Sequence, residues 1–218
     1  MRPEALAAFL DGLDGSWAGL SLTMPLKQAV LPLLASASDL VASVAAANTV
    51  LLPARRGENT DVAGIVAALA EAGVASVDRA VVLGGGATAR SALAALALLG
   101  CTAPILVVRS EPVETLAAAA RLGVTPTVVG WEPEVLTGCE LLVSTVPAGA
   151  ADALAPYVGD VPVLLDVVYA PWPTVLAAAC RGTVVAGTAM LLHQAAEQVR
   201  LMTGQEPPLS AMRSALPR

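Results

Sequence analysis

One side chain in this sequence is suited to proton transfer in a way that its neighbours are not. Lys27 is the only lysine among 218 residues, and the other eleven of the twelve Lys and Arg side chains are arginines. Arginine stays protonated in proteins, whereas burial or nearby charge readily lowers the pKa of a lysine. Lys27 is therefore a candidate acid/base group. The alternative is a surface lysine with no chemical role, and the surrounding residues bear on that choice.

A glycine-rich segment is the second chemical signal. Residues 84–89 read Gly-Gly-Gly-Ala-Thr-Ala, after an apolar run at 80–83 and before an alanine-rich run that ends near residue 99. This is the G-x-G-x-x-A spacing of a strand-to-helix turn, where free backbone N–H groups bind a dinucleotide's pyrophosphate. The flanking elements favour this function over a purely structural turn. The cofactor contacts expected here are Gly84, Gly85, Gly86, Ala87 and Thr88.

The end of the next expected strand indicates which dinucleotide binds. An NAD enzyme places Asp or Glu there, about 20 residues after the glycines, to hold the ribose 2′-hydroxyl. This sequence has Val108, Arg109 and Ser110 instead. A cation and a hydroxyl suit a 2′-phosphate, so Arg109 and Ser110 favour NADP. Glu111 and Glu114 would oppose a phosphate and weaken that prediction, and a solvated arginine at a strand end is the alternative.

Three polar segments stand out from the alanine-rich background, namely residues 23–27, 48–49 and 59–61. Each falls at the boundary of an expected element, where side chains from different segments converge on one cleft. An aspartate such as Asp61 near Lys27 would stabilise the charged amine and hold it in place. Each segment also has a structural interpretation, because residues 59–61 suit a helix N-cap and Asn48 suits a turn.

The composition argues against several classes of protein. The net charge of -6, without a basic or aromatic stripe, argues against nucleic-acid binding. The mean hydropathy of +0.71 raises the question of a membrane span, but the uncharged stretch at 91–108 is broken by Gly100, Thr102 and Pro104. Residues 1–4 lack the apolar core of a secretory signal. A cytoplasmic protein is expected.

The three cysteines do not indicate a metal site or a disulfide framework. Cys101, Cys139 and Cys180 are far apart and lack metal-ligand spacing. We expect all three to be reduced and buried, and we expect no bound metal.

Residues 61–202 alternate between helix-like and strand-like pieces, which predicts a doubly wound parallel sheet of the α/β class. The chain is 56% hydrophobic but only 3% aromatic, a mixture that suits helices packed on a buried parallel sheet. The expected strands are 80–83, 105–108, 127–129, 141–144, 162–168 and 184–186. The expected helices are 62–69, 87–99, 111–122, 150–157 and 190–202. Residues 1–60 form a smaller layer with a strand at 20–23, a helix after Pro25 and a strand at 48–52.

Taken together, these segments resemble the shikimate dehydrogenase family. The motifs that carry the resemblance are residues 19–27, 47–49 and 59–64, the glycine turn at Gly84, and residues 144–147, 166–174 and 187–195. They occur in the family's order and extend over nearly the whole chain.

The resemblance implies reversible, NADPH-dependent reduction of 3-dehydroshikimate to shikimate in the biosynthesis of aromatic amino acids. By the family pattern, Lys27 is the acid/base group and Asp61 is its partner. This suits the chemistry, because hydride addition to a carbonyl leaves an alkoxide that needs a proton. The positions that match substrate contacts are Thr23, Asn48, Tyr169 and Gln194, and those near the nicotinamide are Val167 and Gly187. His193, the only histidine, is expected to face away from Gln194 and to be structural.

The sequence departs from the family pattern at its start. The family begins with a strand and a helix whose two serines, in a Ser-x-Ser-Pro-like stretch, bind the substrate carboxylate. Residues 1–13 of this chain match the second helix of relatives. We therefore expect either a longer natural protein or a shortened member with an exposed sheet edge and weak substrate binding.

The expected organisation is a substrate domain at residues 1–63, incomplete at its start and completed by residues 188–218, and an NADP-binding Rossmann-like domain at residues 64–187. A small-molecule substrate is expected, with no nucleic-acid or membrane partner, in a monomer or homodimer. Two alternatives stay open. One is a catalytically impaired NADP-binding relative without the carboxylate site, and the other is a quinate/shikimate dehydrogenase that uses NAD.

Overall fold

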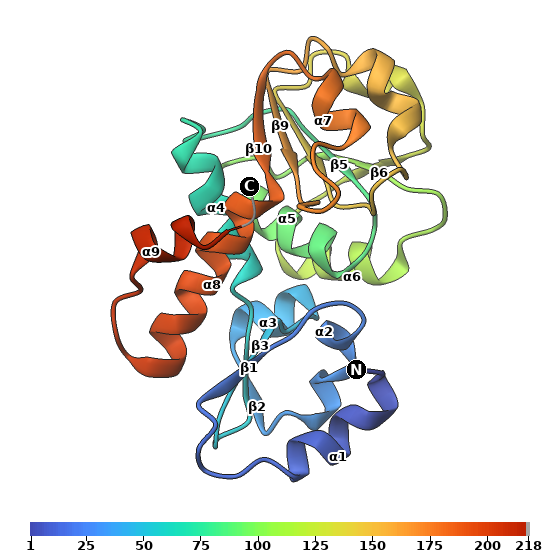
Figure 1. The fold of residues 1–218 in the computed structure, drawn as a ribbon. Helices are drawn as coiled ribbons and strands as arrows, with labels where there is room; N and C mark the ends of the chain where they lie inside the picture. Colours follow the sequence, from blue (N-terminus) through green and yellow to red (C-terminus); the bar gives the residue numbers. More distant parts are fainter. Residues whose placement is uncertain (217–218) are drawn as a thin grey trace.

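The larger part of the molecule is built around a six-stranded parallel sheet (Figure 1). The structure, a computed structural model, describes residues 1–216. The strands are β5 (Ala80–Leu83), β6 (Ile105–Val107), β7 (Thr127–Val129), β8 (Leu141–Ser144), β9 (Val163–Asp166) and β10 (Thr183–Ala186). Their order, β10-β9-β8-β5-β6-β7, is that of a Rossmann fold with the switch point between β5 and β8. The predicted doubly wound parallel sheet is confirmed.

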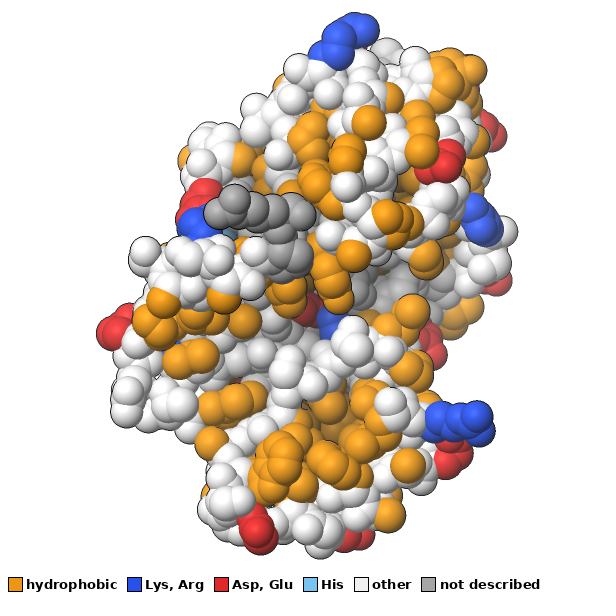
Figure 2. All heavy atoms as spheres, viewed as in Figure 1, with side chains coloured by type: hydrophobic (Ala, Val, Ile, Leu, Met, Phe, Trp, Pro, Cys, Tyr) orange, Lys and Arg blue, Asp and Glu red, His pale blue; other side chains and the backbone are white. Residues whose placement is uncertain are grey.

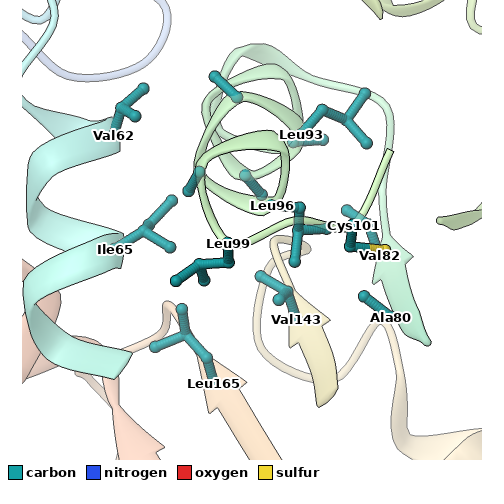
Figure 3. Close-up of a cluster of buried hydrophobic side chains, with 14 of the residues drawn as sticks. Val62, Ile65, Ala80, Val82, Leu93, Leu96, Leu99, Cys101, Val143 and Leu165 are labelled. Carbon is teal, nitrogen blue, oxygen red and sulfur yellow. The ribbon is translucent and has the colours of Figure 1, made fainter. Parts of the chain in front are cut away.

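Helices cover both faces of this sheet. They are α4 (Asp61–Glu71), α5 (Ala87–Leu98), α6 (Val113–Arg121) and α7 (Val175–Ala179), with 3-10 helices η3 (Pro133–Leu136) and η4 (Asp152–Tyr157). On one face, Val62 and Ile65 of α4 pack beside Leu93 and Leu96 of α5, over Val82 of the sheet (Figure 3). On the other face, Val81 and Leu83 pack with residues of η4 and α7. Alternate residues of one strand thus serve opposite cores, as the two-residue period of a strand requires.

The smaller layer contains a four-stranded mixed sheet in the order β1-β3-β4-β2. Its elements are η1 (Pro3–Ala5), α1 (Leu6–Asp11), β1 (Gly19–Ser21), α2 (Leu26–Ala29), η2 (Leu31–Leu33), β2 (Ser36–Ala37), α3 (Asp39–Val44), β3 (Thr49–Leu51) and β4 (Arg56–Glu58). Leu6 and Leu10 of α1 pack on Leu20, Val41 and Val50 in a separate core. Among residues 1–216, strand β1 pairs with β3 alone and is therefore an edge strand of the sheet.

Helix α8 (Gly187–Thr203) runs from the end of β10 toward the smaller layer, and α9 (Leu209–Ser214) turns back along it, where Arg213 contacts Glu71 of α4. Helix α8 packs along α4, and its Gln198 reaches Thr49 of β3. The long helix thereby lies beside both sheets (Figure 1). The expected substrate segment 188–218 ends with two residues that lie outside the described part.

The bounds of several predicted elements are wrong. The strand expected over 162–168 ends at Asp166, because the Asp166 carboxylate accepts the N–H of Val168 and turns the chain out of the sheet. The segment at 150–157 forms only the 3-10 helix η4, and the last long helix begins at Gly187 rather than at Met190. Strands β2 and β4 and helices α3, α7 and α9 are additional.

The cysteines are free thiols, but they differ in exposure. Cys101 and Cys139 are buried as expected, whereas the predicted burial of Cys180 is wrong. Cys180 is half-buried because it follows the last residue of α7 near the end of the sheet. Within residues 1–216, no helix combines the length and the apolar character needed to cross a bilayer.

Candidate functional site

Lys27 and Asp61 form an ion pair between the two layers. Lys27 is the second residue of α2, and Asp61 is the first residue of α4. Lys27 Nζ donates to Asp61 Oδ2 at 2.6 Å, and the side chains are 13% and 4% exposed. Because solvent screens such a shielded pair weakly, Asp61 holds the amine in a defined orientation.

Asp61 is fixed from its other side by amide side chains. Asn48 Nδ2 donates to Asp61 Oδ1 at 2.9 Å, and Asn48 Oδ1 accepts the Thr60 N–H at 2.8 Å. Asn59 Oδ1 accepts the Asp61 N–H at 3.1 Å and so caps the first turn of α4. The helix cap and the polar cluster are therefore one structure, in which every member is hydrogen-bonded.

Helix α8 adds two buried glutamines that lie one turn apart. Gln194 Oε1 accepts from Asn48 Nδ2 at 3.2 Å. Gln198 Nε2 donates to Thr49 Oγ1 at 2.9 Å. Gln198 is not among the predicted site residues, although two glutamines at i and i+4 on an apolar helix are a usable signal.

A pocket of about 270 Å³ lies at this cluster. Figure 2 shows the hollow between the upper and lower parts of the molecule. The predicted site residues that line the pocket are Thr23, Lys27, Asp61, Thr88, Val167, Tyr169, Gly187 and Gln194. Asn48 does not line it, and instead supports Asp61 and Gln194 from behind. The lining also includes four residues outside the predicted site, namely Ser21, Leu22, Met190 and Leu191.

The glycine turn follows β5 and begins α5. Gly84 has a φ of +105°, and a Cβ there would lie 2.7 Å from Thr145 Oγ1, so glycine is required. At Gly86, the N-cap of α5, a Cβ would meet no atom within 4 Å. The N–H groups of Ala87 and Thr88 open the helix and have no intrahelical acceptor. An anion can therefore approach this helix end closely.

A second pocket, of about 280 Å³, lies on the other side of the turn. Gly84, Gly85, Arg109 and Ser110 are among its lining residues, and so is Glu111. The Arg109 guanidinium donates to the carbonyl oxygen of residue 150 at 2.9 Å and lies 5.2 Å from the centroid of the Trp131 ring. A cation stacked on an aromatic ring thus forms one wall of the pocket.

The loop after β9 carries Val167 and Tyr169 to the first pocket. Asp166 Oδ2 accepts from Thr174 Oγ1 at 2.7 Å, which ties the two ends of the loop together. Burial raises the pKa of Asp166, and its hydrogen bonds oppose that shift. A Cβ at Gly187 would lie 2.2 Å from Val167 O, so only glycine lets α8 begin this close to the loop.

His193 does not line the pocket. Its Nε2 lies 3.1 Å from Glu71 Oε1, which is within ion-pair distance but without hydrogen-bond alignment. The neighbouring Gln194 faces the pocket, so the two side chains leave α8 in different directions.

The fold and the site define a dinucleotide-dependent oxidoreductase, in which a Lys–Asp pair adjoins the glycine turn of a Rossmann sheet. Residues 1–50 match the family model of the shikimate dehydrogenase substrate binding domain. Residues 187–216 match that of the shikimate 5'-dehydrogenase C-terminal domain.

Individual relatives agree with these matches. A shikimate dehydrogenase (NADP(+)) of Halobacterium salinarum is 37% identical over 98% of this chain and 84% of its own. The crystal structure of Mycobacterium tuberculosis shikimate dehydrogenase superposes with a TM-score of 0.91 at 36% identity, covering 99% of this chain and 85% of that one. The Thermus thermophilus shikimate 5-dehydrogenase in complex with NADP(H) and shikimate has a TM-score of 0.86 at 30% identity, covering 99% and 84%. The chain belongs to the shikimate dehydrogenase family.

Proposed function

We propose that this chain is an NADP-dependent shikimate dehydrogenase that interconverts 3-dehydroshikimate and shikimate. The observation that carries the proposal is the shared pocket. Lys27 of the smaller layer and Asp61 at the start of α4 line the same cavity as Thr88 from the glycine-turn helix. A proton donor and a dinucleotide site thus adjoin one space that suits a small polar substrate.

The residues present fit NADP. The open space at Gly86 and the free N–H groups of Ala87 and Thr88 suit the pyrophosphate. Arg109 and Ser110 would hold the 2′-phosphate in the second pocket. Val167 and Gly187 line the first pocket beside Thr88, where the nicotinamide would lie.

Lys27 would move the proton. When bound, the cofactor would supply the hydride as NADPH or accept it as NADP⁺. Reduction of the substrate carbonyl leaves an alkoxide, and the Lys27 ammonium donates a proton to that oxygen. In the oxidative direction, the neutral Lys27 amine accepts the proton of the substrate hydroxyl. Asp61 keeps the amine oriented in both directions through the 2.6 Å contact.

The polar side chains around Lys27 would bind the substrate. Thr23, Tyr169 and Gln194 line the pocket with groups that hydrogen-bond hydroxyls. Asn48 would act through Asp61 and Gln194, which it holds in place. We assign substrate binding to residues 1–63 and 188–216, with Tyr169 contributed by the cofactor-binding residues 64–187. A cytoplasmic location and a monomeric or homodimeric state stay predictions.

A direct assay tests the proposal. The purified chain is mixed with shikimate and NADP⁺, and NADPH formation is followed by absorbance. We expect turnover, with a larger kcat/KM than for quinate or for NAD⁺. Binding of NADPH without turnover would identify a catalytically impaired relative instead. A larger kcat/KM for quinate with NAD⁺ would identify a quinate dehydrogenase.

A further inference from the structure

A buried arginine connects the glycine-turn helix to the layer that carries Lys27. Arg90 is the fourth residue of α5 and is 1% exposed. Its Nε donates to Val44 O at 2.8 Å, its Nη2 to Ala45 O at 3.1 Å, and its Nη1 to Glu114 Oε2 at 3.1 Å. A buried guanidinium is costly without partners, and here all three of its nitrogen atoms have one.

The two carbonyls that accept from Arg90 lie at the end of α3. Ala45 caps this helix with a left-handed φ of +53°, which turns the chain toward β3. The last carbonyl groups of a helix lack intrahelical donors and attract cations. Arg121 of α6 donates to the neighbouring Ser43 O at 3.0 Å. The smaller layer is therefore held at α3 by arginines of the larger part.

Two short routes lead from Arg90 to Lys27. The first follows the backbone, because Ala47, two residues after Ala45, donates its N–H to Lys27 O at 2.8 Å. The second passes through Glu114, whose Oε2 also accepts from Gln28 Nε2 at 2.5 Å. Gln28 is the residue next to Lys27.

Arg90 is equally close to the glycine turn. The backbone N–H of Arg90 donates to Gly86 O at 3.1 Å, within the first turn of α5. The next residue, Ser91, contacts Asn59 Nδ2 at 3.3 Å, and Asn59 caps the helix that begins with Asp61.

We propose that Arg90 is a positioning residue that sets Lys27 relative to the glycine turn, with Glu114 and Gln28 as an outer latch. The inference rests on the proposed function, since the distance that Arg90 sets matters only if proton and hydride transfer occur at one substrate. Arg90 touches neither the substrate pocket nor the second pocket, so its effect passes through other residues.

The test compares wild type with Arg90→Met and Arg90→Lys, each in saturating NADP⁺ and shikimate. We expect kcat to fall at least tenfold in Arg90→Met, while the Kd of NADP⁺ changes less than threefold. Arg90→Lys keeps the charge but cannot reach three acceptors, so its kcat should lie between those of wild type and Arg90→Met. Leu164→Ala is the stability control, because Leu164 is buried in the core on the opposite face of the sheet. It should lower Tm without a comparable loss of kcat.

A second readout does not depend on activity. Lys27 is the only lysine, so mass spectrometry of an acylated peptide cut free of the Met1 amine, as by cleavage after Glu4, reports on Lys27 alone. We expect Lys27 in Arg90→Met to be acylated at least threefold faster than in wild type, because the contact with Asp61 is loosened. Glu114→Gln and Gln28→Met, at exposed positions, should also speed the acylation of Lys27, by a smaller factor and without lowering Tm.

The outcomes separate the two proposals. A wild-type chain that does not oxidise shikimate would overturn the proposed function, while the acylation rates would still test Arg90. Unchanged acylation and unchanged kcat in Arg90→Met, with Tm lowered as in Leu164→Ala, would show that Arg90 only stabilises the fold. Should Arg90→Met not fold, wild-type acylation rates in both latch variants would overturn the inference.

Discussion

Gly64 of α4 lies directly against Gln194 of α8. A Cβ built at Gly64 would lie 2.9 Å from Gln194 Cβ and 2.9 Å from Met190 O. The missing side chain lets the two helices approach until Gln194 Oε1 lies 3.2 Å from Asn48 Nδ2. The close crossing of α4 and α8 thus fixes the position of Gln194 in the substrate pocket.

Replacing Gly64 should disturb both stability and the site. Gly64→Ala gains up to about 1 kcal/mol in helix propensity, but overpacking costs about 1–3 kcal/mol, so a net loss on the order of 1 kcal/mol is expected. Urea unfolding measures this loss, and KM for shikimate should rise. Gly15→Ala is the control, since a Cβ there meets no atom within 4 Å. Equal midpoints for both variants would contradict the close crossing.

Arg109 and Glu111 should act on cofactor affinity in opposite directions. Both line the second pocket. Arg109→Met removes the cation, so the Kd of NADPH should rise by tenfold or more while that of NADH changes little. Glu111→Gln removes a negative charge, so NADPH should bind more tightly. Fluorescence titration with NADPH and with NADH gives the Kd values of wild type and of both variants. An equal rise in the Kd of NADPH and of NADH in Arg109→Met would show that Arg109 does not bind the 2′-phosphate.

Glu71 should contribute stability that is lost in acid. Burial acts to raise its pKa, but the Arg213 hydrogen bond at 2.6 Å and nearby His193 bring the pKa below its ordinary value of 4.5. When the pKa of a carboxyl group is lower in the folded state than in the unfolded state, its ionisation stabilises the protein at pH values above the unfolded-state pKa. That stability is lost as the pH falls through the folded-state pKa. Glu71→Gln should therefore lower Tm at pH 7, and the difference from wild type should shrink as the pH falls below the ordinary value of 4.5. A difference independent of pH would rule out this ion pair, and Glu4→Gln is the charge control.

Cys139 should resist thiol reagents in the folded protein. Burial raises the pKa of its thiol to about 11, so little thiolate exists at neutral pH. Iodoacetamide at pH 7.5 should modify the half-buried Cys180 first, with Cys139 and Cys101 reacting only after denaturation. Mass spectrometry of timed samples checks the order. Early labelling of Cys139 would mean that the far face of the sheet opens readily.

The elements differ in how much of them the sequence predicts. Strands β5, β8 and β9 are buried on both faces and read as continuous apolar runs, so their existence is predictable. Strands β2 and β4 are short, and Ser36 pairs with Arg56 without any alternating pattern. Such strands exist only because distant segments meet, which local patterns do not show.

The same limit applies to the site. Lys27, the glycine turn and the polar segments carry chemical signals of their own, which allowed them to be singled out. Arg90 carries none, because an arginine in an alanine-rich helix resembles a solvated side chain. Its burial depends on the carbonyls of Val44 and Ala45, which come from another layer. Gln198 differs from Arg90 because its spacing from Gln194 is a local signal, but its partner Thr49 lies on a separate sheet and does not follow from that spacing.

The most direct test of the account is the turnover of Lys27→Arg beside Lys27→Met, with the NADPH Kd of each. Arginine keeps the positive charge facing Asp61 but does not exchange its proton near neutral pH. We expect kcat to fall by about 10²–10⁴ in both variants, the range that general acid–base catalysis contributes, with NADPH affinity nearly unchanged. Near wild-type kcat in Lys27→Arg would show that the charge alone is needed, and would contradict proton transfer by Lys27.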